Sequence, residues 1–92
     1  MIMRIHPHAS ERMKERGATL DEVKRTLAEG ERFSAGGGRA GYTKTFAGEG
    51  AREGETRRGK RLDVLSREDN GTLTVIHVSV KFVREGDHEH HL

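Results

Sequence analysis

The clearest hydrophobic pattern in the chain follows Thr19. Leu20, Val23 and Leu27 recur at helical spacing and form one apolar stripe. Thr19 and Glu22 fit a capping box, in which each side chain hydrogen-bonds to the backbone N–H of the other residue. The pattern therefore predicts an amphipathic helix that begins after Thr19 and ends at the next glycine.

A shorter helix is predicted just before it, over residues 8–15. Pro7 suits a first helical turn because its missing N–H has no partner to lose there, and Gly17 supplies a stop. Ala9 and Met13 lie four residues apart and share one apolar face. The short connection between the two helices predicts a helical hairpin.

Alternating patterns predict strands over residues 2–6, 41–46, 60–67 and 72–83. Residues 34–59 are rich in glycine and poor in aliphatic side chains, so both flanks of the strand at 41–46 are expected to be mobile loops. The fold class is α+β: a short N-terminal strand, a two-helix hairpin, and a three- to four-stranded antiparallel sheet. Residues 1–83 would form one domain, and residues 84–92 a disordered His-rich tail.

The register of the last hairpin follows from its apolar positions. A three-residue loop at residues 69–71 sets Val64 opposite Ile76 and Leu62 opposite Val78, whereas a two-residue turn would mix apolar with polar partners. The three-residue loop is therefore predicted. The resulting apolar face contains Leu62, Val64, Ile76, Val78, Val80 and Phe82.

The other face of this hairpin is the first candidate for chemistry. It would carry Arg61, Asp63, His77, Ser79 and Lys81, joined by Tyr42 and Lys44. Asp63 would lie opposite His77 and favour its imidazolium form. Cations that hold a phosphate, beside a histidine that moves a proton, are what RNA phosphodiester chemistry needs. The plainer interpretation is a solvated sheet face, which is common in antiparallel sheets.

A second candidate is the row His8, Arg12 and Arg16 on the first helix. It could bind phosphates. Alternatively, His8 caps the helix and the arginines pair with Glu11 and Glu15. Both interpretations stay open at this point.

Composition narrows the classes of function. The 92 residues suffice for one domain, and an excess of 17 basic over 15 acidic residues is too small to imply a polyanionic partner by itself. The absence of cysteine excludes disulfides and thiolate zinc sites. No apolar run could span a bilayer, so a cytoplasmic protein without membrane contact is expected. No cofactor motif or rigid metal site is found, and His88, His90 and His91 would bind metals only adventitiously.

Three segments carry a family resemblance: His8-Ala9-x-x-Arg12-Met13-x-x-Arg16-Gly17, then Glu22-Val23 with Leu27-x-x-Gly30, and finally Leu73-Thr74-Val75-Ile76-His77-Val78. Together they resemble a family of small bacterial and phage-associated domains related to the RelE, ParE and BrnT toxins. The resemblance implies the order strand, two helices, antiparallel sheet. It also implies a metal-independent endoribonuclease toxin that acts with a cognate antitoxin, with Arg61, His77 and Lys81 at the comparable sheet positions.

Two main hypotheses follow. In the first, Arg61 and Lys81 bind phosphate, His77 acts as acid or base, Asp63 orients it, and Arg12 and Arg16 extend the contact with RNA. In the second, the domain is a non-catalytic module that binds a protein or a nucleic acid, because a sparse core suits a domain that orders on binding. A third is an orphan domain whose partner has been lost. The expected partners are RNA and an antitoxin protein, and the chain itself is expected to be a monomer or a weak dimer.

Overall fold

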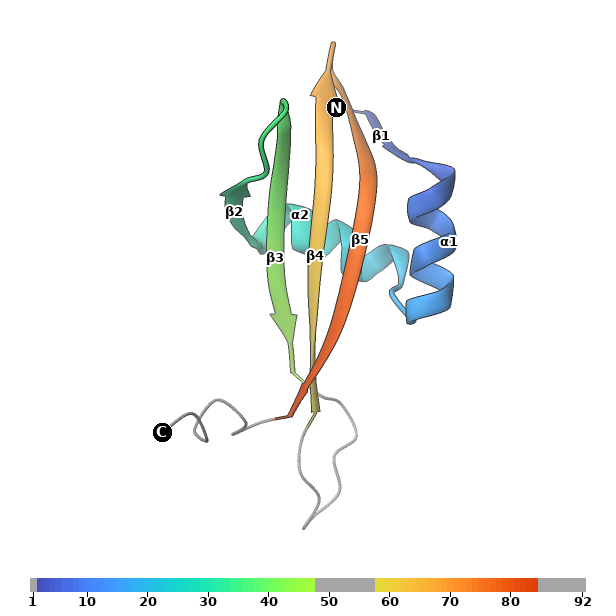
Figure 1. The fold of residues 1–92 in the computed structure, drawn as a ribbon, viewed down its shortest axis with the longest axis vertical. Helices are drawn as coiled ribbons and strands as arrows, with labels where there is room; N and C mark the ends of the chain where they lie inside the picture. The colour runs from blue at the N-terminus through green and yellow to red at the C-terminus, as the bar shows by residue number, and fades with distance from the viewer. Residues whose placement is uncertain (1, 48–57, 85–92) are drawn as a thin grey trace.

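The computed structural model describes residues 2–47 and 58–84, and within them the chain forms two helices and five strands (Figure 1). Along the chain these are β1 (Ile2–Ile5), α1 (Pro7–Arg16), α2 (Leu20–Glu29), β2 (Glu31–Ser34), β3 (Arg39–Phe46), β4 (Arg58–Asp69) and β5 (Thr72–Arg84). This order confirms the predicted α+β class. The sequence pattern did not predict β2.

The strands form one five-stranded mixed sheet in the order β1-β5-β4-β3-β2. β1 runs parallel to β5, and the other neighbouring pairs are antiparallel. A parallel pair needs a long crossover, and here both helices and three strands separate β1 from β5 in the chain. The antiparallel prediction is therefore correct for β2 to β5, and β1 makes the sheet mixed.

The helices cover one face of the sheet. α1 packs against β5, while α2 packs against β3 and β4 and passes behind the strands in Figure 1. The buried core between the two layers consists of Ala9, Met13, Ala18, Val23, Leu62, Val64, Val75 and Val78. Phe82, which the alternation placed on the apolar face, is 65% exposed.

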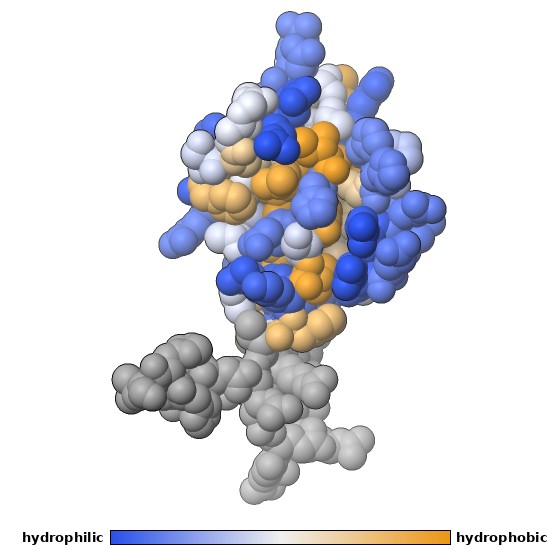
Figure 2. Space-filling view, viewed as in Figure 1, coloured by the Kyte–Doolittle hydropathy of each residue, from blue (hydrophilic) through white to orange (hydrophobic). Residues whose placement is uncertain are grey.

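The opposite face of the sheet has no helix over it, and Figure 2 views the molecule from this side. Directly opposite residues on neighbouring strands share a face, so the register places cross-strand rows on this open face, four of which follow the row of Ile2, Thr72 and Asp69 at the β4–β5 turn. The rows are Arg39, Arg67, Thr74 and Arg4; then Phe33, Gly41, Leu65 and His77; then Glu31, Thr43, Asp63 and Ser79; and last Thr45, Arg61 and Lys81. Figure 2 shows hydrophobic surface in the middle of this face with hydrophilic residues around it.

Both helices begin and end at the predicted signals. His6, rather than His8, is the N-cap of α1 and accepts a hydrogen bond from the His8 N–H, while Gly17 ends the helix with φ 78°. The predicted capping box of α2 is present between Thr19 and Glu22. These local signals are correct because they depend only on neighbouring residues.

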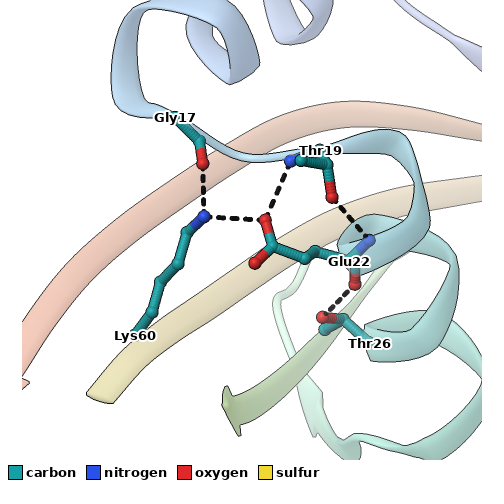
Figure 3. A network of polar contacts seen from close by, with 5 residues as sticks. All are labelled: Gly17, Thr19, Glu22, Thr26 and Lys60. Atoms are coloured by element: carbon teal, nitrogen blue, oxygen red, sulfur yellow. Dashed lines mark hydrogen bonds and ion pairs between the residues drawn. The ribbon is translucent and has the colours of Figure 1, made fainter. Parts of the chain in front are cut away.

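A polar network fastens the start of α2 to the sheet (Figure 3). Lys60 of β4 donates to a Glu22 carboxylate oxygen at 2.7 Å and also to the Gly17 carbonyl. The same Glu22 oxygen accepts the Thr19 N–H at 2.9 Å. Burial raises the pKa of Glu22, but the hydrogen bonds and charge of Lys60 and the Thr19 N–H outweigh burial, so the pKa lies below its ordinary value.

The predicted register of the β4–β5 hairpin is wrong. Asp69 lies opposite Thr72, so the loop is the two residues Asn70 and Gly71 instead of three. Their φ angles are 49° and 80°, and positive values at both central residues are typical of a type I′ turn. Asparagine followed by glycine is the preferred pair for this turn because both tolerate the left-handed region.

A β-bulge then restores the apolar face that the two-residue turn would otherwise break. Ser66 lies opposite Val75, but Leu65 lies opposite His77, so Ile76 is an extra residue in β5. Val75 is fully buried as a result, and His77 is exposed on the open face. The register predicted from the apolar positions did not include the bulge, because the prediction took β5 to be a regular strand.

The apolar pairs of the hairpin are therefore displaced. Val64 faces Val78 and Leu62 faces Val80, each two residues further along β5 than predicted. Ile76, predicted as a core residue, is only partly buried. The predicted face stays apolar, because the shorter turn and the one-residue bulge together shift the register by two residues.

The glycine-rich segment is only partly as expected. Residues 35–38 form the tight loop between β2 and β3, so this part is a hairpin loop instead of a mobile linker. Predictions for residues 48–57 and for the tail at 85–92 fall outside the described residues. Among the residues that are described, no helix is long and apolar enough to cross a membrane.

Candidate functional site

A pocket of about 400 Å³ lies between the first turns of α1 and the bulge of β5. We call it the histidine pocket, and its lining residues are His6, His8, Ala9, Arg12, Ile76 and His77. His8 and Arg12 come from one predicted cluster and His77 from the other. The fold therefore joins two candidate sites that sequence analysis treated separately.

The α1 wall of the pocket is ordered by the start of the helix. The His6 Nδ1 atom accepts the His8 N–H at 3.1 Å, and the two rings stack with centroids 5.5 Å apart and planes 5° from parallel. Because Nδ1 of His6 accepts a hydrogen bond, the neutral ring of His6 carries its proton on Nε2. Arg12, one helical turn after His8, adds a guanidinium to the same wall.

The β5 wall of the pocket is ordered by the bulge. The extra residue, Ile76, lines the pocket, and the next residue, His77, faces outward instead of into the core. His77 Nε2 lies 3.0 Å from the Ser79 hydroxyl, two residues along the same face. This contact holds the imidazole ring. Bulges often lie next to active sites, where they redirect a side chain in this way.

The chemistry of the pocket is that of imidazole and guanidinium groups. An Arg guanidinium binds phosphate oxygens through several N–H donors, and imidazoles can both donate and accept a proton near neutral pH. Among the described residues no group of three or more histidine, cysteine or acidic side chains is arranged to hold a metal ion. The imidazoles and the guanidinium are therefore suited to bind a phosphate and to move a proton to or from a group next to it.

The predicted pair of Asp63 and His77 is not formed. Asp63 lies opposite Ser79, because the bulge shifts the register, and its carboxylate accepts a hydrogen bond from Arg61 at 3.3 Å. Lys81 lies opposite Arg61, two rows away from His77 on the open face. Asp63 is therefore not placed to orient His77, and the two cations lie outside the histidine pocket.

Tyr42 and Lys44 lie on the helix-covered face, not with the polar cluster to which the sequence assigned them. They are opposite Val64 and Leu62, which are core residues. Lys44 pairs with Glu29 at the end of α2 at 3.3 Å. Even-numbered residues of β3 lie on the same face as the core residues of β4. The sequence analysis predicted no register between these two strands, so it could not assign this face.

Arg16 and Arg61 occupy positions apart from the pocket. Arg16 ends α1 and does not line the pocket, although it continues the row of His8 and Arg12. Arg61 lines a second cavity of about 350 Å³ near the end of α2, and its Nε atom is buried without a hydrogen-bond partner among the described residues.

Two lining residues of the pocket escaped sequence analysis. His6 precedes Pro7 directly, and this position before a proline at a helix start could have identified it as the N-cap. Ile76 was assigned to the core by alternation alone. Its role depends on the bulge, for which the local sequence holds no clear signal.

Comparison with protein-family models, with curated proteins and with solved structures gives no match for this chain. The resemblance to the RelE-related toxins stays a prediction. A functional assignment therefore has to be built from the histidine pocket and the open face.

Proposed function

We propose that this chain binds RNA and cleaves its backbone at the histidine pocket without a metal ion. The observation that carries the proposal is the convergence of three imidazoles and one guanidinium on one pocket, from two different elements. Paired imidazoles beside a cation match the needs of phosphodiester transfer, in which one proton is removed and another is donated.

The reaction assigns a role to each wall of the pocket. Arg12 binds the scissile phosphate and stabilises the charge that develops on its oxygens. One imidazole, from His8 or His77, accepts the proton of the ribose 2′-hydroxyl as its oxygen bonds to phosphorus. The other donates a proton to the 5′-oxygen as its bond to phosphorus breaks. The products are a 2′,3′-cyclic phosphate and a 5′-hydroxyl, so atoms and protons balance.

Two further residues act through these groups. His6 stacks on His8 and holds the start of α1, so it is a positioning residue. Ser79 contacts His77 Nε2 and fixes the orientation of the ring. Both contacts restrict the rotation of the reacting imidazoles before RNA binds, so less conformational freedom is lost on binding.

The family resemblance adds a partner to this proposal. A ribonuclease toxin would be held inactive by a cognate antitoxin, and a protein that covers the histidine pocket would serve that purpose. This part of the proposal rests on the resemblance, whereas the RNA site rests on geometry.

The test is cleavage of a fluorescent RNA oligonucleotide by purified protein in the presence of EDTA. We expect His77→Ala and Arg12→Ala to lower the cleavage rate by about a hundredfold or more, since a general acid or base contributes on that scale. Lys14→Ala, on an exposed position of the same helix, is the matched control and should leave the rate unchanged.

Product chemistry and folding complete the design. A cyclic phosphate terminus on the product supports the imidazole mechanism, and unchanged circular dichroism shows that each variant is folded. Cleavage undiminished in folded His77→Ala would remove His77 from the mechanism. Binding of RNA with no cleavage by the unaltered chain would overturn the catalytic part and leave an RNA-binding module.

A further inference from the structure

A row of arginines crosses the open face at the end nearest the β4–β5 turn. Arg39, Arg67 and Arg4 lie in one cross-strand row over β3, β4 and β1, with Thr74 of β5 between the last two. Arg39 and Arg67 are directly opposite each other. Like charges in that position repel, so the pair costs stability unless an anion lies between them.

The two guanidinium groups are held in place by backbone carbonyls. Arg39 donates to the carbonyls of Ala35 and Gly36, each at 3.2 Å, and Arg67 donates to the Gly37 carbonyl at 3.4 Å. The carbonyls belong to the β2–β3 loop, where residues 36–38 are glycines with φ between 60° and 75°. Glycine permits this left-handed run, and the loop thereby fixes the guanidinium groups before any ligand arrives.

These arginines differ from three other cations of the sheet. Lys44, Lys60 and Arg61 each pair with a carboxylate. Within the described parts of the chain, the arginine row forms no ion pair, and Asp69, two residues from Arg67 on the same face, belongs to the next cross-strand row. The row therefore keeps its positive charge available for an anion.

An aromatic ring lies in the next row. Phe33 of β2 packs over Gly41 so closely that a Cβ atom on that glycine would overlap the ring. Phe33 is nevertheless 38% exposed, so part of the ring faces solvent. Bases of single-stranded nucleic acids stack on aromatic rings presented by open sheets in this way.

The same row connects Phe33 to the histidine pocket. It continues through Gly41 and Leu65 to His77, which lines that pocket. Along β4, Arg67 lies two residues from Leu65, a separation of about 7 Å. A phosphate on the arginines, a base on Phe33 and a scissile phosphate near His77 could thus belong to one strand.

We propose that the open face binds single-stranded RNA, with Arg39, Arg67 and Arg4 holding its phosphates and Phe33 stacking a base in the row that leads to the histidine pocket. The choice of RNA as ligand rests on the proposed function. The positions of the arginine row and of Phe33 follow from the sheet register and do not depend on the proposed function. The proposal excludes a duplex, whose stacked bases cannot meet Phe33.

The test measures binding separately from cleavage, by fluorescence anisotropy on full-length protein that carries His77→Gln. We expect single-stranded RNA to bind more tightly than a duplex of the same sequence. The pair of substitutions Arg39→Gln and Arg67→Gln should weaken binding about tenfold at low salt. It should also reduce the slope of log affinity against log salt by about 0.7 for each phosphate that the protein no longer neutralises. Phe33→Ala should weaken binding about fivefold or more, and Phe33→Tyr should restore it.

Lys24→Gln, at an exposed position of α2, is the control for loss of a surface charge away from the row and should leave affinity and salt slope unchanged. Unchanged slope in the folded double variant would overturn the arginine row even if His77-dependent cleavage is observed. Equal affinity for duplex, or no binding of single-stranded RNA, would overturn the proposed face. Arginine-dependent binding by a chain that never cleaves RNA would support the face and refute the catalytic function.

Discussion

At the scale of single residues, the histidine pocket depends on side chains that a helix and a strand bring together. His8, Arg12 and His77 were all predicted as candidates, and they line one pocket. Sequence spacing placed the first two on a helix and the third on a strand. Their convergence depends on how α1 packs against β5, which no local pattern reports. Asp63 was wrongly joined to His77 because a turn one residue shorter and one extra residue in β5 together shift its partner by two residues, to Ser79.

The Glu22 and Lys60 pair gives a prediction about stability. Both side chains are mostly buried, with exposed fractions of 20% and 18%, so the pair is screened less than a surface ion pair. Glu22→Gln keeps the shape but removes the charge that Lys60 faces. We expect it to lower the free energy of unfolding by about 1 kcal/mol at neutral pH, as measured by urea denaturation.

The pH dependence of this loss has a definite sign. Because the pKa of Glu22 is lowered in the folded protein, its stabilisation is present at neutral pH and is lost as pH falls through that lowered pKa. The unaltered chain and Glu22→Gln should therefore converge in stability as the pH falls below the ordinary glutamate value of about 4.3. Asp21→Asn, at the exposed neighbouring position, should show a smaller difference. A gap that stays constant with pH would contradict the ionised pair.

At the scale of elements, prediction succeeded where neighbouring residues decide the structure. The capping box of α2 and the glycine that ends α1 are both found as expected. β2 was missed because its four residues are all exposed, so no alternation of apolar and polar positions marks it. The β4–β5 register was predicted wrongly because a turn one residue shorter and a one-residue bulge together leave the same residues on the apolar face. The alternation of apolar and polar residues is therefore the same in both registers and cannot distinguish them.

The turn itself gives a sharp test of the register. In a type I′ turn Asn70 has positive φ, so Asn70→Gly should be tolerated within about 0.5 kcal/mol. Asn70→Ala should cost about 1 kcal/mol, because an alanine Cβ disfavours the left-handed region. Thermal unfolding of the two variants measures both values. In the three-residue loop Asn70 would have negative φ, and the order of the two variants would reverse.

At the scale of the whole molecule, one sheet serves two purposes. The helix-covered face carries the core, and its apolar residues made the α+β class predictable from sequence alone. The open face carries the arginine row, Phe33 and His77, and it reaches the histidine pocket at the edge of β5. This assembly could not be predicted, because Arg4, Arg39 and Arg67 come from three strands that only the sheet order brings together.

NMR spectra of the histidine imidazoles, the Phe33 ring and the Leu20 methyl groups, recorded while a short single-stranded RNA is added to the intact chain, can show whether the pocket and the open face act as one site. We predict that the resonances of His8, His77 and Phe33 change together, with one common affinity, while Leu20 on the exposed side of α2 does not respond. Changes confined to α2, or no change at His77 at any RNA concentration, would contradict an RNA site on this face.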